Sequence, residues 1–163
     1  REAQQRQLKQ PYAEAAQDAQ RFRYDAYISY VDREPDASWV WETLVPRLVQ
    51  GGLRIAVSGD VKEPGVAQVV GIERGIKQAK RTVIVLSEAY LVDHYADFEN
   101  VLAQTMGIQE GTYRLLPVKI EPIDDCRLPL RLNMLTTLDL AHPHRASREF
   151  DRLVQALRGP LPG

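Results

Sequence analysis

The sequence predicts an α/β fold in which helices cover both faces of a parallel sheet. Two observations carry this prediction. Segments rich in strand-forming residues alternate five times with segments of helical apolar spacing, and short links join them, as in right-handed β–α–β crossovers. The segment 82–86, TVIVL, is a continuous apolar run, which is typical of a central strand buried on both faces.

Five strands are expected where β-branched and aromatic residues gather between turn signals. Pro117 removes a backbone donor from the fourth strand, so we place that strand near the sheet edge. With the apolar run at the centre, the expected order is 2-1-3-4-5, a flavodoxin-like three-layer α/β fold with a five-stranded parallel sheet. The expected strands are 24–30, 53–57, 82–86, 114–120 and 136–140.

Four helices are expected to cover this sheet. Asp36 can cap the first, Pro46 should kink it, and Ser147 can cap the last. The segment 121–135 has turn signals and is expected to be irregular. The expected helices are 36–50, 69–79, 97–106 and 147–157.

The composition indicates one globular domain of ordinary size. The 163 residues are 44% hydrophobic and 26% charged, which is enough for a single core and argues against disorder. A net charge of −1 with scattered basic residues offers no surface for nucleic acid. No apolar run is long enough to span a membrane, the polar start shows no signal peptide, and the single Cys126 fits a reducing compartment. We therefore expect a cytoplasmic protein with no nucleic-acid or membrane partner.

Residues 1–20 differ from the rest because they contain almost no large apolar side chains. They are expected to form a linker or a surface helix, and the main domain is expected to span 21–160. The first residue is Arg1, not Met, which suggests a piece of a larger parent protein with other domains. Arg outnumbers Lys sixteen to five, which favours a GC-rich, bacterial source.

Three short boxes stand in order at the ends of expected strands. They read YDAYISYVD at 24–32, GDVKEPG at 59–65 and LSEAYLVDHYADFEN at 86–100. Together they resemble the conserved boxes of Toll/interleukin-1 receptor (TIR) domains, and the resemblance covers about residues 22–158. In the third box Ser87, Tyr90 and Glu99 match the family pattern in place. Tyr95 and Ala96 stand where Trp and Cys are usual, so the aromatic wall is smaller and a thiol role is lost.

The resemblance implies one of two functions. Some TIR domains are docking modules that self-associate, and others, including many bacterial ones, cleave NAD at the nicotinamide–ribose bond with that glutamate. The cleavage needs stabilisation of an oxocarbenium-like ribose, which one ionised carboxylate can supply. We expect Glu99 at a cleft, in the first turn of a helix whose dipole favours the anion. NAD would be a substrate and no cofactor is expected, because the chain has no G-x-G-x-x-G motif.

Glu99 is therefore the expected catalytic residue. Plain structural roles stay open for its neighbours, since tyrosines often pack in cores and loop carboxylates are often only solvated. Self-association through TIR surfaces, including the loop 58–65, is expected to complete the pocket and raise activity. The expected substrate-binding residues are the polar and aromatic groups at the strand ends: Ser29, Tyr30, Asp32, Asp60, Glu63, Ser87, Tyr90 and Tyr95.

Two other functions fit the sequence less well. The three histidines, among them His142 and His144 in a loop, are too few and badly spaced for a metal site. A phosphoreceiver, which shares the sheet topology, needs an Asp after the third strand, but Ser87 stands there. The favoured hypothesis is an NAD glycohydrolase, with or without cyclisation, in immune or anti-phage defence. The alternative is a non-catalytic TIR homotypic interaction module.

Overall fold

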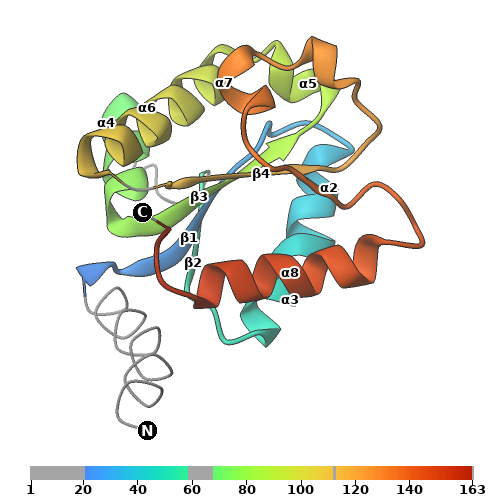
Figure 1. Cartoon of the computed structure of the whole chain (residues 1–163), viewed down its shortest axis with the longest axis horizontal. Coiled ribbons are helices and arrows are strands. Elements are labelled where there is room, and N and C mark those ends of the chain that lie inside the picture. Colours follow the sequence, from blue (N-terminus) through green and yellow to red (C-terminus); the bar gives the residue numbers. More distant parts are fainter. Residues whose placement is uncertain (1–20, 59–67, 112, 163) are drawn as a thin grey trace, which may run out of the picture.

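The computed structural model describes residues 21–58, 68–111 and 113–162. These residues form a five-stranded sheet in the order β2-β1-β3-β4-β5, with helices on both faces (Figure 1). Every neighbouring pair of strands is parallel. This confirms the predicted fold class and strand order. The strands are β1 (Tyr24–Ser29), β2 (Ile55–Val57), β3 (Ala79–Leu86), β4 (Leu115–Lys119) and β5 (Leu138–Asp139).

Two layers of helices enclose the sheet (Figure 1). The helices on one face are α4 (Gln68–Gln78), α5 (Glu88–Leu91), α6 (His94–Glu110) and α7 (Leu130–Asn133). The elements on the other face are α2 (Asp36–Trp39), the π-helix η1 (Val40–Leu44), α3 (Val45–Gln50) and α8 (Ala146–Arg158). A short 3-10 helix, η2 (Asp125–Arg127), lies in the segment expected to be irregular. Within the described ranges no helix is both long and apolar enough to cross a bilayer.

The central strand is β3, and all of its eight residues are buried. It pairs with β1 on one side and with β4 on the other, and helices cover both of its faces, which is why its second half, the segment 82–86, shows no polar alternation. Pro117 precedes the two residues of β4 that pair with β5, so its missing N–H does not interrupt that ladder. The fourth strand is next to last in the sheet, as its proline suggested.

The two faces of the sheet carry two separate apolar cores. One lies under η1, α3 and α8 and contains Leu44, Leu48 and Leu153. The other lies under α4 and α6 and contains Ile72 and Ala103. Each fully buried side chain of leucine or isoleucine size stabilises the fold by about 1.5–3 kcal/mol relative to exposure. The cores fix the helices against the sheet and so position the loops at its ends.

The first predicted helix is divided into α2, η1 and α3. Pro46 is the cause, because it has no N–H to donate to the preceding turn and its ring crowds that turn. The chain responds with one wider, π-helical turn just before the proline.

Both predicted helix caps are wrong. Asp36 is the first residue of α2, where it is buried, and the cap position is Pro35. Ser147 lies inside α8, and Arg145 precedes that helix. In addition, α5 and α7 were not predicted, and α7 lies within the segment 121–135 that was expected to be irregular. The helix α6 begins three residues before the predicted 97.

Candidate active site

The strand ends that carry the first and third boxes meet at the carboxyl edge of the sheet. Ser29 ends β1, and Ser87 follows β3. Because neighbouring parallel strands end on the same side, these two residues and the helix after Ser87 lie close together. The Ser29 Oγ and the Tyr90 hydroxyl oxygen are 2.8 Å apart and share a buried hydrogen bond. This bond joins the end of β1 to α5.

Ser87 joins α5 to α2. Its Oγ accepts a hydrogen bond from the backbone N–H of Tyr90 at 3.1 Å, which is the N-cap of α5. Its hydroxyl proton is donated to the Asp36 carboxylate, at Oδ2. Both bonds are buried, so Ser87 holds one fixed orientation.

Asp36 is the carboxylate that accepts the hydrogen bond of Ser87, and the sequence analysis did not predict this role. It is buried, and burial raises the pKa of its carboxyl group above the usual value. The hydrogen bond from Ser87 opposes that rise, and the nearby charges of Glu121 and Glu34 add to it. No local sequence signal separates a buried Asp from an ordinary helix cap, because both stand just before an apolar helix.

Glu99 lies on α6, on the side that faces the sheet. It is only 3% exposed, and Ala103, one turn later on the same face, belongs to the apolar core under α6. Two expectations are therefore wrong. Glu99 stands in the second turn of the helix, where the dipole acts weakly, and it lies below the surface instead of at an open cleft. In this low-dielectric position its charge acts strongly on its neighbours.

Tyr27 lies beside Glu99. Its side chain on β1 is fully buried and points to the same face of the sheet as Ser29, two residues later. Burial, and then the charge of Glu99, raise the pKa of the Tyr27 phenol far above its ordinary value, so it stays neutral. Its hydroxyl makes no hydrogen bond to another described residue. The sequence reasoning missed Tyr27, although a tyrosine inside a buried strand was a visible signal.

The structure brings together four of the predicted site residues, namely Ser29, Ser87, Tyr90 and Glu99. Tyr90 is close enough to Tyr27 to raise its pKa, and this contact links the Ser29–Tyr90 bond to the neighbourhood of Glu99.

The remaining predicted residues do not join this group in the described structure. Tyr30 points to the opposite core, where its hydroxyl accepts a hydrogen bond from Trp41 Nε1 at 3.0 Å. Asp32 is exposed. Asp60 and Glu63 lie outside the described residues, and for Tyr95 only the backbone, near the start of α6, is described.

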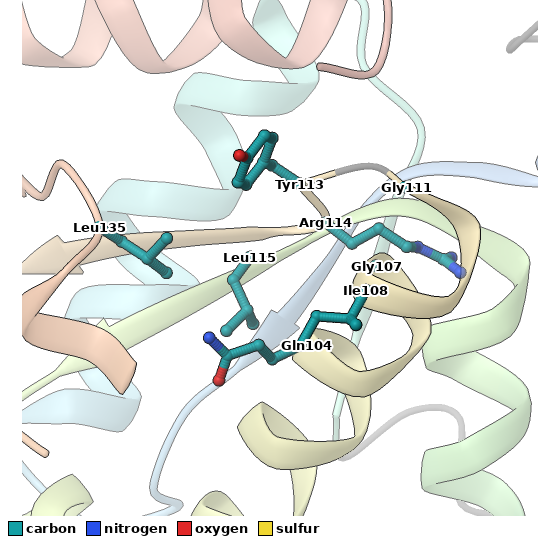
Figure 2. Close-up of a pocket in the computed structure, with 8 residues that line it drawn as sticks. All are labelled: Gln104, Gly107, Ile108, Gly111, Tyr113, Arg114, Leu115 and Leu135. Carbon is teal, nitrogen blue, oxygen red and sulfur yellow. The ribbon is translucent and has the colours of Figure 1, made fainter. Parts of the chain in front are cut away.

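A pocket of about 260 Å³ lies at the other end of α6 (Figure 2). Ile108, which lines it, is nine residues after Glu99, or about 14 Å along the helix axis. It is therefore distinct from the site around Glu99. Its lining residues are Gln104, Gly107, Ile108, Gly111, Tyr113, Arg114, Leu115 and Leu135.

Among the described residues, no group of three His, Cys, Asp or Glu side chains could hold a metal ion. His142 and His144 lie in an exposed loop with their ring centroids 5.5 Å apart.

Comparison with known proteins supports the resemblance of the three boxes. A family model described as TIR domain matches residues 27–154. Toll-like receptor 6 of Mus musculus is 27% identical over 116 residues, which are 71% of this chain and 14% of that receptor. This chain therefore spans only a small part of the length of such relatives.

Solved structures share the fold. The TIR domain of the Toll-related receptor TRR-2 from Hydra magnipapillata has a TM-score of 0.70 at 24% identity, covering 83% of this chain and 98% of that one. The TIR domains of the activated Roq1 resistosome have a TM-score of 0.64 at 12% identity, covering 82% of this chain and 99% of theirs. The family model matches most of the length of this chain, and the strand order is the predicted one. This chain therefore belongs to the TIR domain family.

Proposed function

We propose that this TIR domain cleaves NAD at the nicotinamide–ribose bond, with Glu99 as the catalytic carboxylate. The observation that carries the proposal is the placement of Glu99. A buried carboxylate lies at the carboxyl edge of a parallel sheet, beside the hydroxyl-bearing residues Tyr27, Ser29 and Tyr90. Ligands of open α/β sheets bind at this edge, and perturbed ionisable groups gather at functional sites.

The cleavage reaction needs few protein groups besides this carboxylate. The C–N bond between ribose and nicotinamide breaks, and its electron pair leaves with nicotinamide, which departs as a neutral molecule. The ribose is left with oxocarbenium character, which a nearby carboxylate stabilises by charge and by hydrogen bonds to the ribose hydroxyls. Water then attacks the ribose, giving ADP-ribose and a proton; attack by a group of the same nucleotide would give a cyclic product instead.

Burial of Glu99 supports the proposal that activity depends on self-association. At 3% exposure the carboxylate is not reachable by a nucleotide in the isolated chain, so the site must rearrange to bind NAD. A neighbouring protomer that contacts the carboxyl edge would stabilise the open arrangement, because binding to one conformation shifts the population toward it. The TIR domains of an activated resistosome, similar in fold, occur in an assembly.

The test is release of free nicotinamide from NAD by the purified chain. Protein is assayed from dilute to concentrated solution and when tethered in an array, with Glu99→Gln as the paired sample. We expect specific activity to rise with concentration and to fall by about a hundredfold or more in the variant. Specific activity that stays constant over the range would contradict dependence on assembly, and absence of release under every condition would contradict the enzyme.

A non-catalytic interaction module is the second candidate, and one observation favours it. Large apolar side chains are exposed along α6, α7 and the start of β4, as expected of a protein-binding surface. They are Val101, Ile108, Tyr113, Leu130 and Met134. If the chain associates but never releases nicotinamide, this function replaces the first. A bacterial source and a role in anti-phage defence stay predictions, since the relatives described above include animal receptors.

A further inference from the structure

The Tyr27 hydroxyl is an isolated polar group inside an apolar core. The side chain is 0% exposed, and its oxygen has no hydrogen bond to another described residue. Leaving a buried hydroxyl without a partner is unfavourable, and buried polar groups in folded proteins almost always have one. A phenylalanine ring would fill the same space without this cost, so the hydroxyl needs an explanation beyond packing.

Besides Tyr90, whose hydroxyl shares a hydrogen bond with Ser29, two other polar side chains are described near this hydroxyl. One is Glu99, whose helix packs against β1. The other is Ser58, whose backbone N–H donates to the Ile28 carbonyl at 3.0 Å and extends the pairing of β2 with β1. Of the two, only the carboxylate of Glu99 must accept hydrogen bonds to be stable as an anion.

The other elements around Glu99 contribute little charge. On this face β3 presents Ile84 and Leu86, and α4 presents Ile72 and Ile76 to the core. The charged residues of α4, Glu73, Arg74 and Lys77, lie on its outer side.

The ionisable groups that remain near the carboxyl edge are few. Tyr90 of α5 is the other described ionisable group close to Tyr27, and Asp36 lies behind Ser87. Lys80 lies at the opposite, amino end of β3, where it binds the Gly159 carbonyl.

We propose that Tyr27 is a positioning residue for Glu99, its phenol donating a hydrogen bond to the carboxylate directly or through one buried water. The proposal rests on the proposed function insofar as Glu99 acts in NAD cleavage. Tyr27 lies on β1, which pairs with β2 on one side and with β3 on the other, whereas Glu99 lies on the helix α6. The phenol therefore sets the orientation in which the carboxylate meets the ribose, and it supplies a donor that favours the charged form.

The proposal predicts a change in how Glu99 titrates. A hydrogen bond to the anion lowers the pKa of a carboxyl group. Removal of the Tyr27 hydroxyl group by substitution should therefore raise the pKa of Glu99. Cleavage needs the ionised carboxylate, so the acid limb of the pH–rate profile should move to higher pH by the same amount. A residue that only fills space would move neither quantity.

The experiment compares Tyr27→Phe with wild type in two independent measurements. The first is nicotinamide release at several pH values with concentrated protein, in which kcat should fall about tenfold or more with KM unchanged. The second is titration of the Glu99 carboxyl carbon by ¹³C nuclear magnetic resonance, with the signal identified by its absence in Glu99→Gln. Tyr24→Phe, a half-exposed tyrosine at the amino end of β1, is the matched control and should leave both measurements unchanged.

The two measurements separate this proposal from the proposed function. A raised Glu99 pKa together with reduced kcat supports positioning. An unchanged Glu99 pKa overturns it, whatever the enzyme does. If wild-type protein releases no nicotinamide, the proposed function fails, and the titration alone then decides whether Tyr27 holds the carboxylate. Ser58→Ala is the third variant. If the pKa of Glu99 shifts in this variant and not in Tyr27→Phe, the donor to the carboxylate is the serine and not the tyrosine.

Discussion

The two ends of the sheet bury opposite kinds of polar group. At the carboxyl edge the buried polar groups are acids and hydroxyls, led by Asp36 and Glu99. At the amino edge they are cations, namely Lys80 and Arg81 of β3 and Arg114 just before β4. Both sets are nearly removed from water, and their difference lies in the partners that they find.

The cations of the amino edge bind backbone carbonyls. Arg114 Nη2 donates to the Ile76 carbonyl in the last turn of α4 at 2.8 Å and also to the Ala79 carbonyl. Lys80 Nζ donates to the Gly159 carbonyl, directly after α8, at 2.7 Å. Helix C-termini carry unpaired carbonyls and the negative end of the helix dipole, so buried cations there tie helices to the sheet.

The acids of the carboxyl edge contact side chains on other elements. Asp36 on α2 binds Ser87 after β3, and Tyr90 on α5 binds Ser29 on β1. Such side-chain acceptors can rotate toward a ligand, whereas backbone carbonyls at a helix end are held in place by the main chain. Burial alone therefore does not mark a functional residue, and the kind of partner separates the two ends of the sheet.

The largest expected effect tests the carboxyl edge. Glu99→Gln keeps the shape of the side chain and removes its charge, so the activation barrier for nicotinamide release should rise by about 3 kcal/mol, at least a hundredfold in rate. The melting temperature should not fall, because the amide fits the same buried space. Nicotinamide assays and thermal melts are run on the same preparations.

Its control is Glu88→Gln. Glu88 is exposed and pairs with Arg127 on the surface, and such pairs contribute little. Activity and melting temperature should both stay near wild type. If Glu99→Gln keeps its rate of nicotinamide release but has a lower melting temperature, the glutamate has a structural role. The carboxyl and amino edges of the sheet would then not differ in function.

The next effect tests the amino edge. Arg114→Met keeps an apolar stem of similar length but leaves the carbonyls of Ile76 and Ala79 without their cation. The free energy of unfolding should fall by about 2–4 kcal/mol, measured by urea denaturation. Nicotinamide release per folded molecule should not change. Arg152→Met, on the exposed side of α8, should stay within about 0.5 kcal/mol; equal stability of both variants would show that the buried cations do not tie the helices.

A smaller effect tests the bonds of Ser87. Ser87→Ala removes the cap of α5 and leaves the buried Asp36 without its donor. The free energy of unfolding should fall by about 1–2 kcal/mol. Ser147→Ala, an exposed serine inside α8, is the control and should change little. If the two substitutions cost the same, the network at the carboxyl edge contributes no stability of its own.

The smallest effect is a dependence on pH. The pKa of Asp36 is raised in the folded state, so the folded protein holds a proton that the unfolded chain releases, and stability falls as pH rises through that window. Asp36→Asn keeps an oxygen that can accept from Ser87 and has no charge. Its melting temperature should therefore exceed that of wild type near neutral pH, and the gain should disappear below the usual pKa of aspartate. A gain that persists in acid would point to a cause other than charge burial.

The amino-acid sequence was sufficient to predict the sheet and several residues of the candidate site. The apolar run in β3, the five alternations and the three boxes were enough for the strand order, for the family, and for the gathering of Ser29, Ser87, Tyr90 and Glu99. These features succeed because hydrophobic periodicity and strand ends are local properties of the chain, and parallel strands bring their carboxyl ends together without further information.

The burial of the polar side chains and their hydrogen-bond partners could not be predicted from the sequence, because both depend on tertiary packing. Asp36 looks like a helix cap along the chain, yet packing of α2 against the end of β3 turns its carboxylate toward Ser87. In the sequence Glu99 has the character of an exposed helical residue. The contact of α6 with β1 nevertheless places it below the surface, beside Tyr27. The pKa of such groups depends on the charges and the solvent around them, and these surroundings come from segments far apart in the sequence.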